Sequence, residues 1–333
     1  MENANVNAER VQKFNTAVQS VKTQLRRDLV GQDEVVDNVI IAIIAGGNVL
    51  LEGVPGVGKT RLVRSLGKTL NLPFSRIQFT PDLMPSDVTG TEIMRKDEQG
   101  NMQSEFRRGP IFANLVLADE INRATPKTQS AMLEVMQEHK VTVAGNTYKL
   151  EEPFFVLATE NPIEQDGTYP LPEAQMDRFM FKLLMKFPSD KELMDIVKMT
   201  QITMAETAEV AMDGHDILEM RELAAQVPVM DEVLDYAVRL VSGTHPEIEG
   251  ASDTAKKYIK YGASPRAAQA LITAAKVRAL MNGNYNVSYE DIDALAAPVL
   301  RHRIKISYGA INEKMNAEDV IAALIKENKK LSK

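Results

Sequence analysis

The octet at residues 53–60 constrains this chain more than any other segment. It fits G-x-x-x-x-G-K-[ST], the P-loop that holds nucleotide phosphates, and reads Gly53-Val54-Pro55-Gly56-Val57-Gly58-Lys59-Thr60. The apolar run 48–52 before it predicts a buried strand, and residues 61–70 can form a helix after it. The N–H groups of such a turn and the positive end of the following helix attract phosphate. We therefore expect Lys59 to reach the β- and γ-phosphates and the Thr60 hydroxyl to ligate Mg²⁺.

The composition is that of an ordinary globular chain, with 44% hydrophobic and 26% charged residues. Its 333 residues are enough for two domains. A net charge of −7 argues against bulk nucleic-acid binding as the main function. The absence of cysteine excludes disulfides, cysteine-ligated zinc and thiol catalysis, and it fits a cytoplasmic protein. No signal-peptide pattern is present, and the longest apolar stretch, 39–45, is too short to span a bilayer.

Short apolar runs alternate with helical patterns up to Pro188. Helices are expected at 7–28 and from Asp33, as its cap, to about Ala45. The apolar runs are residues 49–51, 74–79, 115–118, 154–158 and 180–185. This alternation predicts an α/β fold with a parallel sheet that helices cover on both faces.

From Asp190 onward the sequence has helical periodicity and no convincing strand. The expected helices are 190–203, 216–226, 231–242, 252–261, 264–282, 288–297 and 317–330. We therefore predict an α/β nucleotide-binding core at residues 1–188 and a helical domain at residues 189–333.

Two segments interrupt the simple alternation of strands and helices. The patterns at residues 91–106 and 141–150 each predict a β-hairpin inserted before a strand of the sheet. The inserts are either ordinary surface loops or contacts for a partner or substrate, since exposed loops on a rigid scaffold often carry function.

Two acids follow the apolar run 115–118, sixty positions after Lys59. At the carboxyl end of a buried strand, Asp119 is expected to hold Mg²⁺ and Glu120 to orient or deprotonate the attacking water. Alone, the pattern also fits a strand followed by the start of a helix. With the P-loop assigned, it predicts hydrolysis as well as binding.

Asn161 and Arg178 are further candidates for the γ-phosphate. Asn161 closes the strand at 154–158 and can hydrogen-bond both the γ-phosphate and the lytic water, although Asn-Pro can also simply make a turn. Arg178 has the planar, permanent charge suited to a neighbouring subunit's γ-phosphate. The alternative for Arg178 is a surface ion pair with Asp177 or Glu173.

Arg266 lies in the first turn of a predicted helix in the second domain. Ser264 suits the N-cap and Pro265 the first helical position. A cation is unfavourable there unless an anion lies nearby, because the helix dipole is positive at this end. A phosphate from the first domain would supply that anion and couple the nucleotide state to the angle between domains.

Together these motifs resemble the MoxR family of AAA+ ATPases over essentially the whole chain. The segments that carry the resemblance are the P-loop, 76–90 (RIQFTPDLMPSDVTG), 118–124 (ADEINRA), 158–162 (ATENP), 171–179 (LPEAQMDRF) and 262–266 (GASPR). The resemblance implies a five-stranded parallel sheet of order 5-1-4-3-2, a C-terminal all-α lid and a hexameric ring.

The resemblance also assigns roles to individual residues. It makes Asn161 sensor 1, Arg266 sensor 2, Arg178 the arginine finger and Arg123 a further interface arginine. It adds Gly31, Gln32, Arg61 and Arg266 to the nucleotide-binding residues. The two hairpins would match the family's helix-2 insert and pre-sensor-1 hairpin.

MoxR-like proteins are usually chaperone-like motors that act with partners bearing von Willebrand factor A domains. We therefore predict a Mg²⁺-dependent ATPase that remodels or matures a partner protein. A magnesium-chelatase-like motor subunit remains open, because it shares these motifs. The acidic charge disfavours a nucleic-acid motor, and Glu120 and Asn161 disfavour a binding switch with little turnover. GTP is disfavoured because no N-K-x-D motif follows the P-loop.

Overall fold

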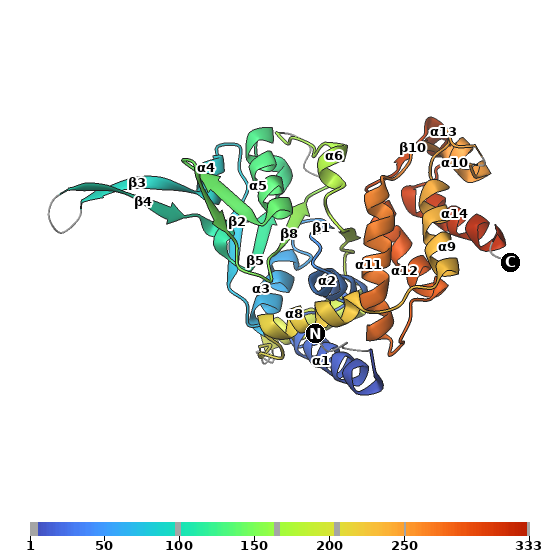
Figure 1. The fold of residues 1–333 in the computed structure, drawn as a ribbon, viewed down its shortest axis with the longest axis horizontal. Coiled ribbons are helices and arrows are strands. Elements are labelled where there is room, and N and C mark those ends of the chain that lie inside the picture. Colours follow the sequence, from blue (N-terminus) through green and yellow to red (C-terminus); the bar gives the residue numbers. More distant parts are fainter. Residues whose placement is uncertain (1–5, 97–100, 163–166, 203–206, 250, 332–333) are drawn as a thin grey trace.

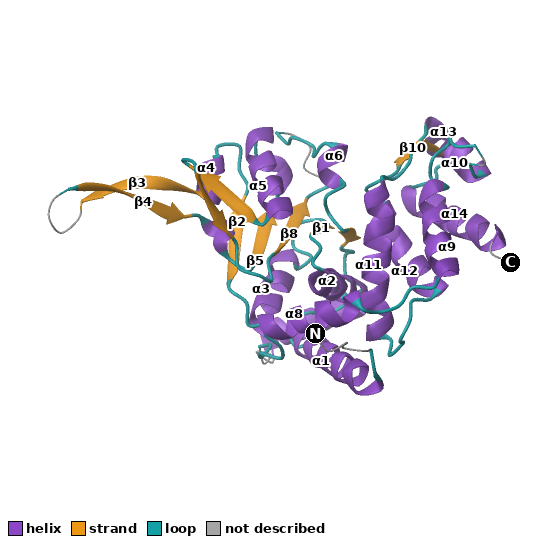
Figure 2. Ribbon diagram, viewed as in Figure 1, coloured by secondary structure: helices purple, strands orange, loops and turns teal. Residues whose placement is uncertain are grey.

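The structure is a computed structural model that describes residues 6–96, 101–162, 167–202, 207–249 and 251–331. An α/β part is followed along the chain by a mostly helical part, and a long hairpin projects away from the sheet (Figures 1 and 2). Among the residues that the structure describes, no helix combines the length and apolar character that a membrane span needs.

The central sheet has five parallel strands in the order β2-β5-β8-β1-β9. Their bounds are β1 Val49–Glu52, β2 Phe74–Gln78, β5 Leu115–Asp119, β8 Phe155–Glu160 and β9 Phe181–Leu184. Counted without the hairpin strands, these are strands 2-3-4-1-5, so the predicted order 5-1-4-3-2 is confirmed. The carboxyl ends of β1, β5 and β8 therefore meet at one edge of the sheet.

Alternate residues of each strand enter different cores because successive side chains point to opposite faces. In β5, Leu115 and Leu117 join the core on one face, whereas Val116 and Ala118 join the core on the other. The first core contains α1 (Ala8–Arg26), α2 (Asp33–Ala45) and α3 (Lys59–Thr69), and the second contains α4 (Pro85–Thr89) and α5 (Pro126–Glu138). Three short helices complete this part: η1 Pro110–Phe112, η2 Ile121–Arg123 and α6 Glu173–Met176.

The start of α2 differs from the expected one. Gln32 is the residue before the helix, and Asp33 is the first helical residue rather than the cap. The Asp33 carboxylate accepts a hydrogen bond from Arg26 Nε at 3.0 Å. The carboxylate that the sequence pattern predicted to cap α2 is therefore paired with Arg26 of α1 instead.

Both interruptions of the α/β alternation are hairpins. One pairs β3 (Gly90–Lys96) with β4 (Met102–Arg108), and the other pairs β6 (Lys140–Val143) with β7 (Asn146–Lys149). The tip of the first hairpin, 97–100, lies outside the described residues. Phe106 of β4 stacks on Tyr148 of β7 with a centroid distance of 4.1 Å. The two inserts are thus joined by an aromatic contact.

The helical part contains eight helices, a π-helical turn and one small sheet within the described residues. Its helices are α7 Asp190–Val197, α8 Gly214–Ala225, α9 Asp231–Ser242, α10 Asp253–Tyr258, α11 Pro265–Met281, α12 Tyr289–Leu300, α13 Tyr308–Asn312 and α14 Ala317–Leu331. The π-helical turn Lys198–Ile202 continues α7, while residue 203 lies outside the described residues.

The expectation of no strand after Asp190 is wrong. Residues 259–261, placed at the end of a helix by their pattern, form β10 (Ile259–Tyr261), which pairs antiparallel with β11 (Lys305–Ile306). Segments of three and two residues are too short for period-2 alternation to emerge from the sequence.

The helical part shares a core with one face of the sheet. Helix α11 packs on α1 and α2, and α8 packs on α2. Arg221 of α8 donates to the carbonyls of Ile43 and Ile44 at 3.3 and 3.2 Å, at the end of α2. The position of the helical part relative to the sheet is therefore fixed by apolar burial and by arginine–carbonyl hydrogen bonds.

Candidate active site

The P-loop connects β1 to α3 through two glycines in the left-handed region. Gly56 has φ +87° and Gly58 has φ +96°, conformations that L side chains rarely adopt. A Cβ at either position would meet no atom within 4 Å, so the backbone angle rather than crowding demands glycine. Gly58 is the N-cap residue of α3, which begins at Lys59. The loop therefore ends at a helix N-terminus, which suits an anion.

Lys59 ties the P-loop to the neighbouring strand. Its Nζ donates to the carbonyl of Gly53 at 2.7 Å and to that of Glu160, the last residue of β8, at 3.1 Å. Burial lowers the pKa of Lys59, and the nearby carboxylates of Asp119 and Glu120 act in the opposite direction. The ammonium group thus lies among the ends of β1, β5 and β8.

Asp119 ends β5 as a buried carboxylate. Thr159 Oγ1 donates to Asp119 Oδ1 at 2.7 Å and accepts the backbone N–H of Glu120 at 2.8 Å. Arg76 of β2 donates to Asp119 Oδ2 from Nη2 at 2.6 Å and from Nε at 3.0 Å. One hydroxyl group therefore contacts both the carboxylate of Asp119 and the backbone of Glu120, and Arg76 neutralises Asp119.

Glu120 has φ +57°, the left-handed region that is uncommon for a residue with a side chain. Its Oε2 accepts from Gln78 Nε2 at 3.2 Å and from Arg123 Nη1 at 3.1 Å. The turn directs the carboxylate toward β2, where these two side chains hold it. Such an outlier at the end of a strand is typical of functional sites.

Arg76 and Gln78 are site residues that the sequence reasoning missed. They alternate along β2, and β2 pairs with β5 so that Gln78 lies opposite Asp119. Polar side chains two positions apart in a strand point to the same face. That alternation within the expected strand 74–79 was the available signal.

Asn161 lies directly after β8 and is buried. It lines a cavity of about 440 Å³ together with Glu52 and Glu160, the last residues of β1 and β8. Burial raises the pKa of Glu160, and Lys182 partly offsets that rise. Lys182 Nζ lies 2.6 Å from a carboxylate oxygen of Glu52 and 3.6 Å from one of Glu160.

Gly31 and Gln32 line a separate cavity of about 250 Å³ before α2. Gly31 has φ +74°, and a Cβ there would lie 2.5 Å from the side chain of Glu192. Gln32 Nε2 donates to the carbonyl of Lys186 at 3.0 Å. These two residues therefore sit where the chain enters the α/β part and where it leaves toward α7.

Thr60 and Arg61 are the second and third residues of α3. The exposed Arg61 guanidinium lies 3.8 Å from the Asp28 carboxylate. The same carboxylate accepts from Ser65 Oγ at 2.5 Å. In this structure Arg61 thus faces the loop after α1.

Arg178 is exposed, and its Nη1 donates to the carbonyl of Leu133 on α5 at 3.4 Å. Arg266, also exposed, donates from Nη1 to Asp177 Oδ2 at 3.2 Å. The anion expected near the start of α11 is therefore supplied by Asp177 in this structure. Among the described residues, neither arginine joins the hydrogen-bond network around Asp119.

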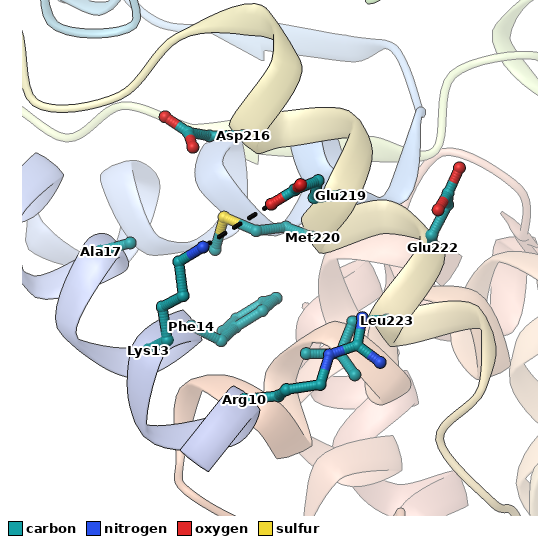
Figure 3. A pocket seen from close by; sticks show the side chains of 9 residues that line it. All are labelled: Arg10, Lys13, Phe14, Ala17, Asp216, Glu219, Met220, Glu222 and Leu223. Carbon is teal, nitrogen blue, oxygen red and sulfur yellow. Dashed lines mark ion pairs between the residues drawn. The ribbon is translucent and has the colours of Figure 1, made fainter. Parts of the chain in front are cut away.

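A cavity of about 350 Å³ between α1 and α8 holds none of the predicted site residues (Figure 3). Lys13 crosses it toward Glu219, with the two charged groups 3.7 Å apart. Near its rim, His215, Asp216 and Glu219 bring possible metal-ligand atoms within 4.8 Å of one another. Glu219 already has the Lys13 ammonium as its counter-ion.

The P-loop, the strand-end acids and the helical part that packs on the sheet define an AAA-type P-loop ATPase. The model of the ATPase family associated with various cellular activities (AAA) matches residues 48–181, and an AAA lid domain matches residues 251–324. The chain belongs to the MoxR family of AAA+ ATPases, as the relatives below establish.

Chaperone MoxR1 of Mycobacterium tuberculosis is 44% identical to this chain over 90% of it and 78% of the relative. Protein MoxR of Paracoccus denitrificans is 31% identical over 84% of this chain and 86% of the relative. The crystal structure of a protein from Cytophaga hutchinsonii superposes with a TM-score of 0.87 at 39% identity, covering 96% of each chain. The predicted family and fold are confirmed.

We predict that Thr159→Val will impair hydrolysis more than ATP binding. Valine keeps the volume but removes the hydroxyl that holds the Asp119 carboxylate and the Glu120 backbone, and misplaced catalytic groups cost on the order of 100-fold in rate. Phosphate release and fluorescent-nucleotide binding measure the two effects. Thr128→Val is the matched control, because Thr128 is equally buried and donates instead to Leu83. Equal losses in both variants would contradict the assigned role of Thr159.

Proposed function

We propose that this chain hydrolyses ATP to ADP and phosphate in a Mg²⁺-dependent reaction, and that assembly into a ring completes its sites. The positions of Lys59, Asp119 and Glu120 support this reaction. Lys59 lies among the strand-end acids, while Thr159 links Asp119 directly to Glu120. A cation suited to phosphate therefore lies beside a carboxylate suited to a metal and another suited to a water molecule, which supports the proposed hydrolysis.

Within one subunit, Gly53–Thr60 would cradle the phosphates and Lys59 would contact their β- and γ-oxygens. The Thr60 hydroxyl and the Asp119 carboxylate are the oxygen donors that Mg²⁺ prefers, and Asp119 already faces a cationic group, Arg76. Bound Mg²⁺ would neutralise charge on the phosphates. Arg76 would then shift from Asp119 as the metal site fills.

Glu120 would orient or deprotonate the attacking water, and Asn161 would hydrogen-bond the γ-phosphate. In this structure Glu120 is held by Gln78 and Arg123. Release from these two donors would leave the carboxylate available to accept a proton from water. The residues Gly31, Gln32 and Arg61 complete the proposed nucleotide contacts.

The remaining parts of the site would come from the lid and from a neighbouring subunit. Arg266 would leave Asp177 for the γ-phosphate of its own subunit. Arg178, which is exposed and turned toward α5, would reach the ATP of the next subunit in a hexamer. Residues 1–188 would form the core and residues 189–333 the lid.

The hydrolysis cycle would drive remodelling or maturation of a client protein in the cytoplasm, together with a partner that bears a von Willebrand factor A domain. The name of the mycobacterial relative supports a chaperone over a chelatase subunit. The β3–β4 hairpin projects from the sheet in Figure 1, and its Phe106 stacks on Tyr148 of the β6–β7 hairpin. The two hairpins would together offer a surface for contact with another protein.

We predict that the Arg178→Ala variant will retain ATP binding but lose most hydrolysis. The substitution removes a positive charge that we propose acts at the ATP site of the neighbouring subunit. An arginine finger contributes roughly 10³-fold or more to turnover. Glu120→Gln subunits keep their own Arg178, so adding them should restore hydrolysis in the Arg178→Ala subunits. Mixtures of several ratios are assayed for phosphate release. A rate of hydrolysis that only falls as the share of Glu120→Gln subunits increases would argue against a shared site.

We predict that a purified von Willebrand factor A protein from the same organism binds the ATP-loaded Glu120→Gln variant more tightly than the nucleotide-free chain. ATP would fix the lid and the subunit contacts that present the binding surface. Surface plasmon resonance in the two nucleotide states measures the difference. Equal affinity in both nucleotide states would show that partner binding does not depend on ATP, against this prediction.

A further inference from the structure

Three consecutive lid residues hold the chain segment that carries Arg178. We call Arg301–Arg303 the lid grip, because each side chain donates to a backbone carbonyl of residues 177–182. The pairs are Arg301 Nη1 with Lys182 at 2.8 Å, His302 Nε2 with Phe179 at 3.0 Å, and Arg303 Nη2 with Asp177 at 3.0 Å. The grip follows directly after α12 and lies against the lead-in to the edge strand β9.

Arg303 makes most of these contacts. Its side chain is 2% exposed, and its Nε donates to Asp177 Oδ1 at 2.9 Å. Its two terminal nitrogens also donate to the carbonyls of Phe179 and Met180, at 2.6 and 3.1 Å. A rigid guanidinium fork with several simultaneous acceptors cannot be replaced by a single ammonium point charge.

Backbone carbonyls of this segment accept hydrogen bonds from the lid. The N–H groups of Asp177, Arg178 and Phe179 donate locally, to carbonyls in the turn of α6. The carbonyls of Asp177 and Phe179 instead accept from Arg303. Buried backbone carbonyls require partners, so the conformation of this segment is conditional on the position of the lid.

Arg178 lies between these two held residues. We propose that Arg303 is a positioning residue that aims Arg178 at the neighbouring subunit's ATP, so that the lid of each subunit controls hydrolysis in the next. The inference rests on the proposed function, in which Arg178 acts across a subunit boundary. Phe179, fully buried beside it, anchors the segment on the core side.

The same segment also contacts the proposed nucleotide sensor. Asp177 accepts from Ser264 Oγ at 2.8 Å and from Arg266 Nη1 at 3.2 Å. Burial raises the pKa of Asp177, but the hydrogen bonds from Ser264, Arg266 and Arg303 outweigh it and leave the pKa below its usual range. Movement of Arg266 toward ATP would remove one donor from the residue preceding Arg178. Nucleotide state in one site is thereby linked to the arginine that serves the next.

The test uses the full chain with Arg303→Lys, which keeps the charge but loses the fork. Hydrolysis by the homogeneous variant should fall roughly 10- to 100-fold through misplacement of Arg178, while the KM for ATP stays within about threefold of the unchanged protein. Arg221→Lys is the matched control, because Arg221 also joins the lid to carbonyls, those of Ile43 and Ile44, away from Arg178. The Arg221→Lys variant should not show this loss of ATP hydrolysis.

Mixtures of variant subunits distinguish misplacement of Arg178 from a general loss of structure. Glu120→Gln subunits supply an intact Arg178 and its grip, so adding them to Arg303→Lys subunits should raise total hydrolysis above that of either parent. No rise in this mixture, alongside rescue of Arg178→Ala by the same Glu120→Gln subunits, would overturn the positioning role and leave the proposed function intact. Failure of both mixtures would instead overturn the shared site itself.

Asp177→Asn provides a second variant if Arg303→Lys does not fold. It keeps the size of the side chain and removes the charge that Arg303 and Arg266 share. The same rescue by Glu120→Gln is expected. Loss of assembly in both variants, measured by mass photometry, would overturn the inference, because the grip would then serve only the fold.

Discussion

Lys59 Nζ donates to the carbonyls of Gly53 and Glu160 and so ties the first turn of α3 to the ends of β1 and β8. The parallel sheet makes this possible, since it brings strand ends from distant parts of the sequence to one edge. Asp119 and Glu120 join the same edge from β5 through the single hydroxyl of Thr159. The proposed chemistry depends on this convergence of three strand ends.

A second set of hydrogen bonds relates the lid to the sheet. The grip at 301–303 holds the backbone before β9 and at its start, and Asp177 in that segment accepts from Arg266 at the start of α11. Apolar burial fixes the lid against α1 and α2, whereas these polar contacts lie where the proposed sensor and the proposed finger meet. Directional bonds can exchange partners with little loss of buried apolar area, which suits a device that changes with nucleotide state.

The sequence predicted the local parts of this arrangement well. The strand before the octet 53–60, the helix after it, the strand that ends at Asp119 and the order of the five strands all agree with the structure. Each of these rests on short-range patterning or on the family resemblance. The strand β10 was missed because two or three residues carry no periodicity.

Polar pairs between residues far apart in the chain could not be predicted from sequence patterns. Arg76 and Asp119 are 43 positions apart, and Arg303 and Asp177 are 126 apart, so no local spacing reveals either pair. The alternation of Arg76 and Gln78 was a usable signal only once β2 was known to pair with β5. The charge of Arg266 was foreseen to need an anion, and the protein supplies one from its own chain at Asp177.

We propose that hydrolysis belongs to the assembled ring rather than to the single chain. The most direct measurement is the rate of ATP hydrolysis per subunit across a wide range of protein concentration, with assembly mass followed by mass photometry in the same samples. We expect a rate that rises as monomers give way to rings and then reaches a plateau. A rate per subunit that stays constant while the protein remains monomeric would contradict it.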